Sequence, residues 1–391
     1  MKKIKLKRGK EESLLRRHPW LFSGAIESAS AEIEEGDIVD VVTSKGEFVA
    51  RGIAALGSIA VRVLSFTEVE IDLEWWKNKI REALQLRRAL GLVGVEHTNC
   101  YRLLHGEGDG VPGLVVDVYG QVAVMQAHAV GIFLMKDTIA QALTEVVGLS
   151  SVYDKSSGTI PKVSGIEAID GYLIGGSVEQ TLLENGMVLQ SAWEGGQKTG
   201  FFIDQRENRE LVRHYARGRR VLNTFCYTGG FSLAALSGGA VSVDSVDSSS
   251  KAIELCRGNI EMNFAEAEHR EIVADAIEFV RDMPSDAYDL IILDPPAFAK
   301  HRGALDNALR AYRRLNAAAI RSAAEGTIIF TFSCSQAVSR EQFRQSVFSA
   351  AAMAGRDVKI LNFLSQPGDH PINIYHPEGE YLKGLVIMVG E

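Results

Sequence analysis

Two short motifs in the last third of the chain carry residues that could do chemistry. Asp294 follows the apolar run Leu290–Leu293 and is itself followed by Pro295 and Pro296. Farther along, a second apolar run ends in Ser333-Cys334-Ser335. Each pattern is typical of a buried strand that ends in reactive residues, and open parallel sheets bind ligands outside the carboxyl ends of their strands. A rigidly held carboxylate beside a thiol predicts covalent catalysis on a flat, electron-poor ring.

Asp294 is the first candidate catalytic residue. Because it ends an apolar strand, we expect its carboxylate to be partly desolvated. The two prolines that follow donate no backbone hydrogen bond and restrict Asp294 to extended geometry. An acid fixed in this way can hold the polar edge of a base and stabilise changing charge on it. The alternative is a structural acid of the loop.

Cys334 is the second candidate. Buried cysteines are usually inert small hydrophobic residues, and we interpret Cys226 and Cys256 in this way. Cys334 instead follows a strand, at the same end of the predicted sheet as Asp294. A thiolate there could attack carbon 6 of a pyrimidine, which makes carbon 5 nucleophilic enough to take a methyl group from a sulfonium.

The elements that must position these residues form an alternating pattern from about residue 207 onward. The predicted strands are Arg220–Asn223, Val241–Val246, Glu271–Val273, Leu290–Leu293 and Thr327–Phe332. The predicted helices are Gly230–Gly238, Ser250–Asn263, Ala276–Asp282, Ala304–Ala324 and Arg340–Ala354. This alternation predicts an α/β fold with a doubly wound, mostly parallel sheet. Val358–Phe363 and Gly384–Val389 could close the sheet as an antiparallel pair.

The loop after the first of these strands contains Gly229 and Gly230, which let the backbone pass close to a ligand. A dinucleotide site needs the G-x-G-x-x-G spacing, and a P-loop needs its lysine. The loop has neither, so it suits a ligand without phosphates at this point, such as S-adenosylmethionine. The alternative is an ordinary turn between a strand and a helix.

The next two strands also end in acids. Asp247 lies where a ribose diol is bound in such folds and could accept both hydroxyl hydrogens. Asp275 could receive the adenine amino group or cap the following helix, and Ser248 or Ser249 could cap the helix before it. We predict a cofactor site made of Phe225, Tyr227, Thr228, Gly229, Asp247, Ser248, Asp275 and Asp294.

The N-terminal half has a different pattern. Short strands are predicted at Lys3–Lys7, Asp37–Thr43, Glu47–Ile53 and Ala60–Ser65, which favours a small β-barrel. A helix over 72–92, a β-meander over 101–127, a helix over 130–147 and strands over 151–190 follow. We therefore predict three domains, with boundaries at 1–72, 73–190 and 191–391.

Composition limits the class of protein. The 391 residues are 46% hydrophobic and 24% charged, which is typical of a folded protein with more than one domain. A run of about 18 apolar residues is lacking, so we expect no transmembrane helix. The four cysteines include no CxxC pair, so we expect no metal site, no disulfide framework and a cytoplasmic location.

The net charge of the chain is −8, but its basic residues are clustered in three stretches. Lys and Arg outnumber acids by eight to two in residues 1–20, by seven to three in 198–220 and by six to one in 299–321. Local basic surface on an acidic body can contact phosphates. Solvated helix faces explain any single stretch equally well, but three stretches together favour an anionic partner.

With these motifs in place, the chain resembles the large-subunit ribosomal RNA cytosine-carbon-5 methyltransferases of bacteria, which carry an N-terminal PUA domain. The resemblance covers nearly the whole chain, and the string Lys198–Arg206 is its most specific part. The other matching motifs are His18–Phe22, His105–Gly110, Pro112–Leu114, Asn223–Gly230, Asp294–Lys300 and Ser333–Ser335.

The resemblance implies a PUA domain for RNA contact, a middle β-rich domain and a Rossmann-like domain that uses S-adenosylmethionine. It implies Cys334 as the nucleophile, Asp294 as the acid that contacts the cytosine, and Asp247 and Asp275 as cofactor contacts. It also implies large-subunit (23S) ribosomal RNA as the partner, no membrane, and a homodimer. Phe202 and Gln205 lie within a matching motif and could line the site, but the sequence alone gives them no role.

Two alternative functions stay open. One is an RNA methyltransferase that acts on a base nitrogen, because an acid followed by two prolines and an aromatic residue serves amine transfer in other enzymes. Here Ala297 intervenes before Phe298, which weakens that reading. The other is a non-catalytic RNA-binding assembly factor, for which the basic stretches and the PUA-like part would suffice.

Overall fold

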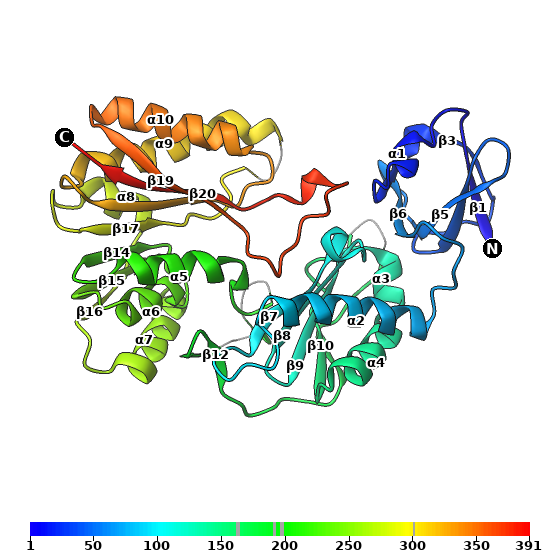
Figure 1. Cartoon of the computed structure of the whole chain (residues 1–391), viewed down its shortest axis with the longest axis horizontal. Coiled ribbons are helices and arrows are strands. Elements are labelled where there is room, and N and C mark those ends of the chain that lie inside the picture. The colour runs from blue at the N-terminus through cyan, green and yellow to red at the C-terminus, as the bar shows by residue number, and fades with distance from the viewer. Residues whose placement is uncertain (162–164, 191–192, 196–198, 300–301) are drawn as a thin grey trace. The chain divides into compact units, whose positions relative to one another are not determined.

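The computed structural model describes residues 1–161, 165–190, 193–195, 199–299 and 302–391. Lys198 and Lys300, at the ends of two matching motifs, lie outside the described residues. The chain divides into two compact units (Figure 1). The first unit comprises Met1–Gly186, Ser191–Ile203 and Gly368–Gly379, and the second comprises Met187–Gln190, Asp204–Pro367 and Glu380–Glu391. The three domain boundaries drawn from the sequence stay predictions.

The N-terminal part of the first unit is a six-stranded sheet with the order β2-β6-β5-β4-β1-β3. Its elements are β1 (Lys2–Leu6), α1 (Glu12–Leu15), β2 (Trp20–Phe22), η1 (Ser23–Ala25), β3 (Ile26–Ala29), β4 (Ile38–Val42), β5 (Phe48–Ala54) and β6 (Ile59–Ser65). All four predicted strands are present, and Leu6, Leu21 and Val61 belong to the core beneath them. The strand β3 was not predicted, because only Ile26 in it is even partly buried and the sequence shows no alternation.

The rest of the first unit contains a five-stranded sheet with the order β11-β10-β9-β8-β7. Its strands are β7 (Cys100–His105), β8 (Leu114–Tyr119), β9 (Val122–Ala127), β10 (Ser151–Asp154) and β11 (Gly171–Ile174), and β12 (Leu182–Glu184) follows. Its helices are α2 (Leu73–Ala89), α3 (Val130–Leu134) and α4 (Lys136–Val147), with η2 (Gly106–Asp109) and, near the other end of the chain, η6 (Pro377–Gly379). The predicted meander is confirmed by the antiparallel pairing of β7 with β8 and of β8 with β9.

Asp72 caps the start of α2, because its side chain accepts a hydrogen bond from the backbone N–H of Trp75 at 2.8 Å. Trp76, Ile80 and Leu84 recur every four residues and are buried. The predicted single helix over 130–147 is wrong, because Met135 has φ −96° and ψ 7° and separates α3 from α4. At these dihedral angles the chain turns before the second helix starts.

The second unit contains a seven-stranded sheet with the order β16-β15-β14-β17-β18-β20-β19. Its strands are β14 (Arg220–Thr224), β15 (Ser242–Asp247), β16 (His269–Val273), β17 (Leu290–Leu293), β18 (Ile328–Ser333), β19 (Val358–Ser365) and β20 (Lys383–Val389), and the short β13 (Met187–Leu189) lies outside it. The first five strands pair in parallel, and β20 runs antiparallel to β18 and β19. The predicted doubly wound sheet and its antiparallel closure are both confirmed.

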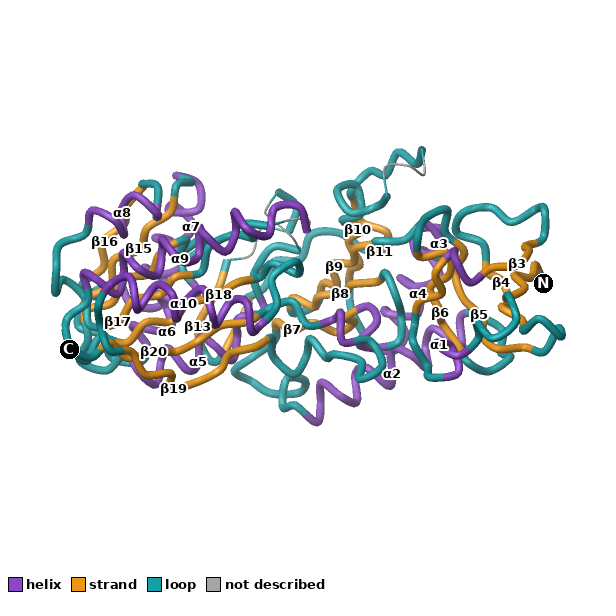
Figure 2. The backbone as a smooth tube through the Cα atoms, turned by 90° about the horizontal axis from the view of Figure 1, so that it is seen from above, coloured by secondary structure: helices purple, strands orange, loops and turns teal. Residues whose placement is uncertain are grey.

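Helices cover both faces of this sheet (Figure 2). They are α5 (Arg206–Tyr215), α6 (Gly230–Ser237), α7 (Ser250–Phe264), α8 (Ala276–Asp282), α9 (Leu305–Ser322) and α10 (Arg340–Ala354), with the short η4 (Ile203–Gln205) and η5 (Arg302–Ala304). The helix α6 contacts both α5 and α7, and in a second group of helices α9 contacts both α8 and α10. All four residues of β17 are buried, as expected for a strand covered on both faces.

The helix α5 was missed by the sequence reading. Its buried residues are Arg206, Asn208, Arg209 and Val212, so its inner face is mostly polar. A helix of this kind lacks the apolar spacing that predicts an amphipathic helix. It begins directly after Gln205.

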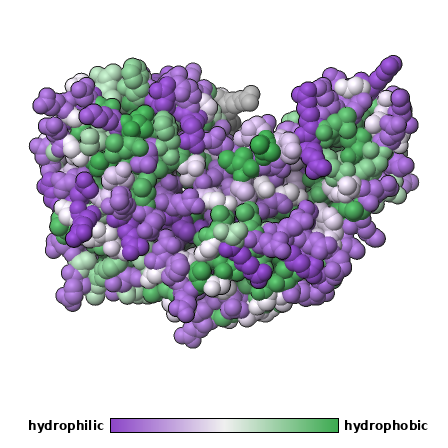
Figure 3. Space-filling view, in the orientation of Figure 1, coloured by the Kyte–Doolittle hydropathy of each residue, from purple (hydrophilic) through white to green (hydrophobic). Residues whose placement is uncertain are grey.

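Polar side chains cover much of the surface seen in Figure 3, with apolar patches between them. Among the described residues, no helix combines the length and the apolar character that crossing a membrane requires.

Candidate active site

The carboxyl ends of β14, β15, β17 and β18 meet at one edge of the seven-stranded sheet, because these strands are parallel and in register. Thr224 pairs with Val246 on one side and with Leu293 on the other, and Leu293 pairs with Thr331. The loops that leave these strands carry most of the residues predicted to bind or react. The sheet therefore brings those residues to a single edge.

The loop after β14 has a strained backbone. Phe225 and Tyr227 have φ values of 55° and 48°, in the left-handed region that residues other than glycine rarely adopt. The loop is held by hydrogen bonds from the N–H of Cys226 to the carbonyl of Val246 (3.1 Å) and from the N–H of Gly229 to the carbonyl of Cys226 (2.8 Å). Strain of this kind clusters at ligand sites, in agreement with the role predicted for this loop.

Gly229 lies at a position where a side chain does not fit. Its φ is 82°, and a Cβ atom there would lie 2.4 Å from the Sγ of Cys256 on α7. The glycine that the sequence suggested for close approach to a ligand is thus also needed for packing against a helix.

Asp247 is held by two backbone amides. Its Oδ2 accepts from the N–H of Tyr227 at 3.0 Å, and its Oδ1 accepts from the N–H of Ser249 at 2.9 Å. A carboxylate has about four acceptor positions, so ribose hydroxyls can still donate to both oxygens. Ser249, and not Ser248, caps α7 by accepting from Ala252, while Ser248 is exposed beside Asp247.

Asp275 caps α8. Its Oδ1 accepts from the N–H groups of Ile277 (2.8 Å) and Glu278 (3.0 Å). The capping role, one of the two considered from the sequence, is therefore confirmed. Its Oδ2 takes part in neither bond, so a contact of Asp275 with adenine stays a prediction.

Asp294 receives a hydrogen bond from Gln205. The Nε2 of Gln205 donates to the Oδ2 of Asp294 at 3.0 Å, and the Oε1 of Gln205 accepts from the Nδ2 of Asn208 at 2.6 Å. Gln205 and Asn208 are both buried. These bonds fix the rotation of the Asp294 carboxyl group. The sequence gave Gln205 no role, because the contact joins residues 89 positions apart. The one sequence feature that pointed to Gln205 as a site residue was its place in the Lys198–Arg206 motif.

The thiol of Cys334 lies beside the loop that carries Asp294. Its Sγ donates to the carbonyl oxygen of Pro295 at 4.0 Å, and Cys334 is partly exposed. Ser335 donates to the carbonyl of Ala299, and so ties the two loops together. The two residues predicted to react are therefore on adjacent loops, as the order of β17 and β18 in the sheet requires.

Tyr312 lies close to both of these residues. Its hydroxyl accepts a hydrogen bond from Ser333 at 2.9 Å. The pKa of Tyr312 is raised to about 12, mainly by burial, with a smaller contribution from the negative charges of Cys334 and Asp294. The tyrosine therefore stays neutral and holds the end of β18 through Ser333.

Lys383 is a residue that the sequence reading missed. It belongs to β20, is 2% exposed, and donates its Nζ to the carbonyl oxygens of Ser335 (2.7 Å) and Val338 (2.6 Å). Burial lowers the pKa of Lys383 to about 8, while the charges of Glu380 and Cys334 act to raise it. A single lysine in an apolar strand carries no sequence signal for such a role.

None of the four cysteines, all of which are described, forms a disulfide bond. Cys226 and Cys256, interpreted from the sequence as inert, are both buried. Among the described residues, no group of three or more His, Cys, Asp or Glu side chains is arranged to hold a metal ion.

Comparison with known proteins connects this geometry to a family. Residues 4–66 match the PUA-like domain, and residues 165–364 match the S-adenosylmethionine-dependent methyltransferase model. Ribosomal RNA large subunit methyltransferase I from Aeromonas hydrophila is 39% identical over 392 residues, with 98% of each chain covered. The protein of the same name from Escherichia coli O139:H28 is 36% identical, with 99% of each chain covered. This chain belongs to the S-adenosylmethionine-dependent methyltransferase family.

A solved structure shares the fold of this methyltransferase. The crystal structure of SMU.776, described as a methyltransferase complexed with SAH, has a TM-score of 0.85, covers 100% of both chains and is 23% identical. The fold class predicted from the sequence is confirmed: a Rossmann-like methyltransferase sheet with an N-terminal PUA-like domain. The predicted cofactor, S-adenosylmethionine, is confirmed by the family.

The loop after β14 fits this cofactor. Thr228 is 2% exposed, and its Oγ1 has no hydrogen-bond partner among the described residues, although its carbonyl accepts from the Nδ2 of Asn259 at 2.8 Å. Leaving such a group unsatisfied costs about 1–3 kcal/mol. The polar groups of S-adenosylmethionine would satisfy it. An unpaired hydroxyl in a strained, glycine-containing loop is therefore consistent with a methyltransferase cofactor site.

Proposed function

We propose that this methyltransferase transfers a methyl group to carbon 5 of a cytosine in large-subunit ribosomal RNA. The observation that carries the proposal is the thiol of Cys334, 4.0 Å from the carbonyl oxygen of Pro295 and beside Asp294. The relatives described above are named as large-subunit ribosomal RNA methyltransferases and align along nearly the whole chain, which supports this substrate. The PUA-like match over residues 4–66 supports binding to RNA.

Cys334 is the proposed nucleophile. Its thiolate attacks carbon 6 of the cytosine, a carbon–sulfur bond forms, and electron density moves toward carbon 5. S-adenosylmethionine, when bound, supplies an electrophilic methyl group on its sulfonium. Carbon 5 takes this methyl group and then loses its proton to a base. Expulsion of the Cys334 thiolate breaks the carbon–sulfur bond and restores the ring.

Asp294 is the proposed contact with the polar edge of the cytosine. Attack at carbon 6 places negative charge on the ring, and Asp294, held rigidly against that edge, stabilises the charge in its protonated form by donating a hydrogen bond to the ring nitrogen. The hydrogen bond from Gln205 keeps the Asp294 carboxyl group in one orientation, so little reorganisation is needed during the reaction. In this scheme Gln205 is a positioning residue.

The loop that carries the nucleophile is held from the other side by Lys383. Its two hydrogen bonds fix the backbone directly after Cys334. A cation within interaction range of the thiolate also stabilises the charged form. Lys383 thus holds the loop of the proposed nucleophile in place and stabilises the thiolate form of Cys334.

The test compares the native protein with Cys334→Ala. Each is incubated with labelled S-adenosylmethionine and unmodified large-subunit ribosomal RNA, and the nucleosides are separated by mass spectrometry. We expect label in 5-methylcytosine with the native protein only. Cofactor binding measured by calorimetry should be the same for both, because Cys334 lies on a different loop from the predicted cofactor contacts.

Other outcomes separate the alternatives. Label in a different nucleoside, or label that survives Cys334→Ala, contradicts covalent cytosine methylation and favours transfer to a base nitrogen, which needs no thiol. Native protein that transfers no label to any ribosomal RNA contradicts the proposed substrate and favours a role in assembly.

We also propose the cytoplasm as the location, because reduced thiols persist there, and a homodimer as the oligomeric state. Light scattering of the full chain measures the mass in solution, and a mass near 42.7 kDa would contradict the dimer.

A further inference from the structure

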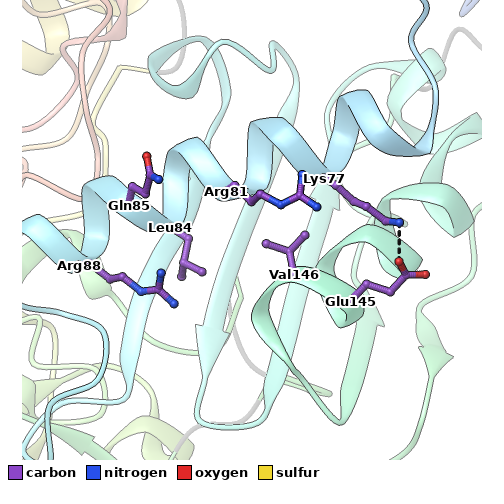
Figure 4. Close-up of a pocket in the computed structure, with 7 residues that line it drawn as sticks. All are labelled: Lys77, Arg81, Leu84, Gln85, Arg88, Glu145 and Val146. Carbon is purple, nitrogen blue, oxygen red and sulfur yellow. Dashed lines mark ion pairs between the residues drawn. The ribbon is translucent and has the colours of Figure 1, made fainter.

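A hollow of about 330 Å³ lies between α2 and α4 in the first unit (Figure 4). Its lining residues are Lys77, Arg81, Leu84, Gln85, Arg88, Glu145 and Val146. The residues from α2 recur at intervals of three or four, so they share one face of that helix. Arg81, Gln85 and Arg88 are exposed, whereas Leu84 is buried at the base of the hollow.

The charges of this hollow are unbalanced. The single positive charge of Lys77 is shared by two carboxylates, because its Nζ contacts Glu145 at 2.6 Å and Glu74 at 2.7 Å, so these three side chains together carry one negative charge. Arg81 donates to the neutral amide oxygen of Asn78, at 2.6 Å. Within the described part of the chain, neither Arg81 nor Arg88 forms an ion pair with a carboxylate. With Arg81 and Arg88 counted, three positive charges face two negative ones, so the hollow keeps a net positive charge that the two guanidinium groups carry.

A neighbouring cation shows the contrast. Lys79 lies on the same helix but outside the hollow, and its Nζ pairs with Glu82 at 2.8 Å. The same Nζ also lies 5.8 Å from the centre of the Trp75 ring. Lys79 thus has internal partners, whereas the two arginines of the hollow are available to an external anion.

The spacing of the two arginines and the apolar residue between them indicate which kind of anion fits the hollow. Figure 4 shows Arg81 and Arg88 projecting from α2 with Leu84 between them. Their seven-residue separation corresponds to about 10 Å along the helix axis. An apolar base between two separated cations suits a chain that alternates apolar sugar faces with phosphates. Arginine matches phosphate particularly well, because its planar group donates two parallel hydrogen bonds.

We propose that the hollow between α2 and α4 binds the sugar–phosphate backbone of the RNA substrate through Arg81 and Arg88. This proposal rests on the proposed function, since it requires an RNA substrate. The contact is with phosphates and sugars, so it contributes affinity and register and does not read the base sequence. It extends RNA binding in the first unit beyond the PUA-like residues 4–66.

The test uses the full chain and a fluorescently labelled fragment of large-subunit ribosomal RNA. Binding is measured by anisotropy over a range of salt concentrations for the native protein, Arg81→Gln, Arg88→Gln and the double variant. We expect the double variant to bind about tenfold more weakly, with the slope of log affinity against log salt reduced by about one to two. At saturating RNA, methyl transfer should keep its native kcat while the KM for RNA rises.

Two controls make the result specific. Lys79→Gln removes one charge from the same helix outside the hollow, and Arg281→Gln with Arg344→Gln removes two arginines that are exposed and paired with acids. Both controls should bind RNA like the native protein. Thermal melting checks that every variant is folded.

The proposal is overturned if the double variant binds RNA with native affinity and salt slope, or if the controls weaken binding equally. A change in binding to polyglutamate without a change in binding to RNA would also overturn it. Native protein that neither binds nor methylates the RNA would instead contradict the proposed function, so the two failures are distinguishable.

Discussion

The ammonium group of Lys383 lies 2.7 Å from the carbonyl oxygen of Ser335, the residue directly after Cys334. A second hydrogen bond, to the carbonyl of Val338, places the same group across the loop that leaves β18. The strand β20 thus holds the loop of the proposed nucleophile through one buried side chain. In the register of the sheet, Lys383 pairs with Ser333, so the contact follows from the antiparallel pairing of β18 and β20.

Replacing Lys383 by methionine keeps most of the side-chain volume but removes both donors. Two buried carbonyl groups then lose their partner, so we expect the free energy of unfolding to fall by about 2–4 kcal/mol. Displacement of Cys334 should lower kcat on the order of a hundredfold without changing the KM for S-adenosylmethionine. Urea unfolding and single-turnover methyl transfer measure these effects.

Two further variants serve as controls. Lys383→Arg should recover part of kcat, and Lys359→Met, at an exposed position of β19, should change neither the free energy of unfolding nor kcat. Native kcat in Lys383→Met would contradict the positioning role.

Stability should also depend on pH through Lys383. Burial lowers the pKa of Lys383 to about 8 from an ordinary value of 10.5. Below pH 8 both the folded and the unfolded chain carry the proton, whereas between these two values only the unfolded chain does. Stability therefore rises with pH across this window. At about 1.4 kcal/mol for each pKa unit, the rise is at most about 3 kcal/mol.

The measurement is urea unfolding at about pH 7.5 and about pH 10, for the native protein and for Lys383→Met. Other groups titrate in both proteins, so the difference between the two isolates Lys383. The free energy of unfolding should rise more with pH in the native protein. An equal pH dependence would show that Lys383 keeps its ordinary pKa.

Gln205→Leu removes the hydrogen-bond donor to Asp294 while filling nearly the same space. Without this bond the Asp294 carboxyl group can rotate, so we expect kcat for methyl transfer to fall by about tenfold to a hundredfold. The affinity for S-adenosylmethionine, measured by calorimetry, should stay within about twofold, because the substitution frees only Asp294 and leaves the other seven predicted cofactor contacts in place. Gln345→Leu, an exposed position on α10, serves as the control. A native kcat would exclude Gln205 as a positioning residue.

Gly229→Ala should disrupt the cofactor loop. Alanine at a φ of 82° is strained by about 1 kcal/mol or more, and its Cβ would lie 2.4 Å from the Sγ of Cys256. We expect S-adenosylmethionine to bind at least about tenfold more weakly, since that factor corresponds to about 1.4 kcal/mol. Gly218→Ala is the matched control, because its φ is 72° and, apart from its two chain neighbours, no described residue has an atom within 4 Å of the added Cβ.

The double variant Gly229→Ala with Cys256→Ala tests the cause of the effect. Removing the Sγ relieves the clash but leaves the backbone strain, so part of the cofactor affinity should return. If Gly218→Ala weakens cofactor binding as much as Gly229→Ala, the clash with Cys256 is not the reason for the glycine.

Local pattern in the sequence determined much of the second unit. The apolar run Leu290–Leu293 and the helices Ala276–Asp282 and Arg340–Ala354 have the predicted bounds. Alternation of strands with helices requires a parallel sheet, and a parallel sheet places the residues after β17 and β18 at one edge. For this reason the sequence pattern alone predicts Asp294 and Cys334 at the same edge of the sheet.

Tertiary structure alone decided which side chains hold those two residues. Gln205 reaches Asp294 across 89 positions, and Lys383 reaches Ser335 across 48. Neither contact leaves a local signal, because a hydrogen bond between distant segments depends on strand register and on the packing of α5 and β20. The same reason applies to the bond from the N–H of Tyr227 to Asp247, which forms only when the loop after β14 folds against it, whereas the bond from the N–H of Ser249 is local. Sequence periodicity predicts which face of a helix or strand is buried, but it does not predict which distant polar group forms a hydrogen bond with a side chain on that face.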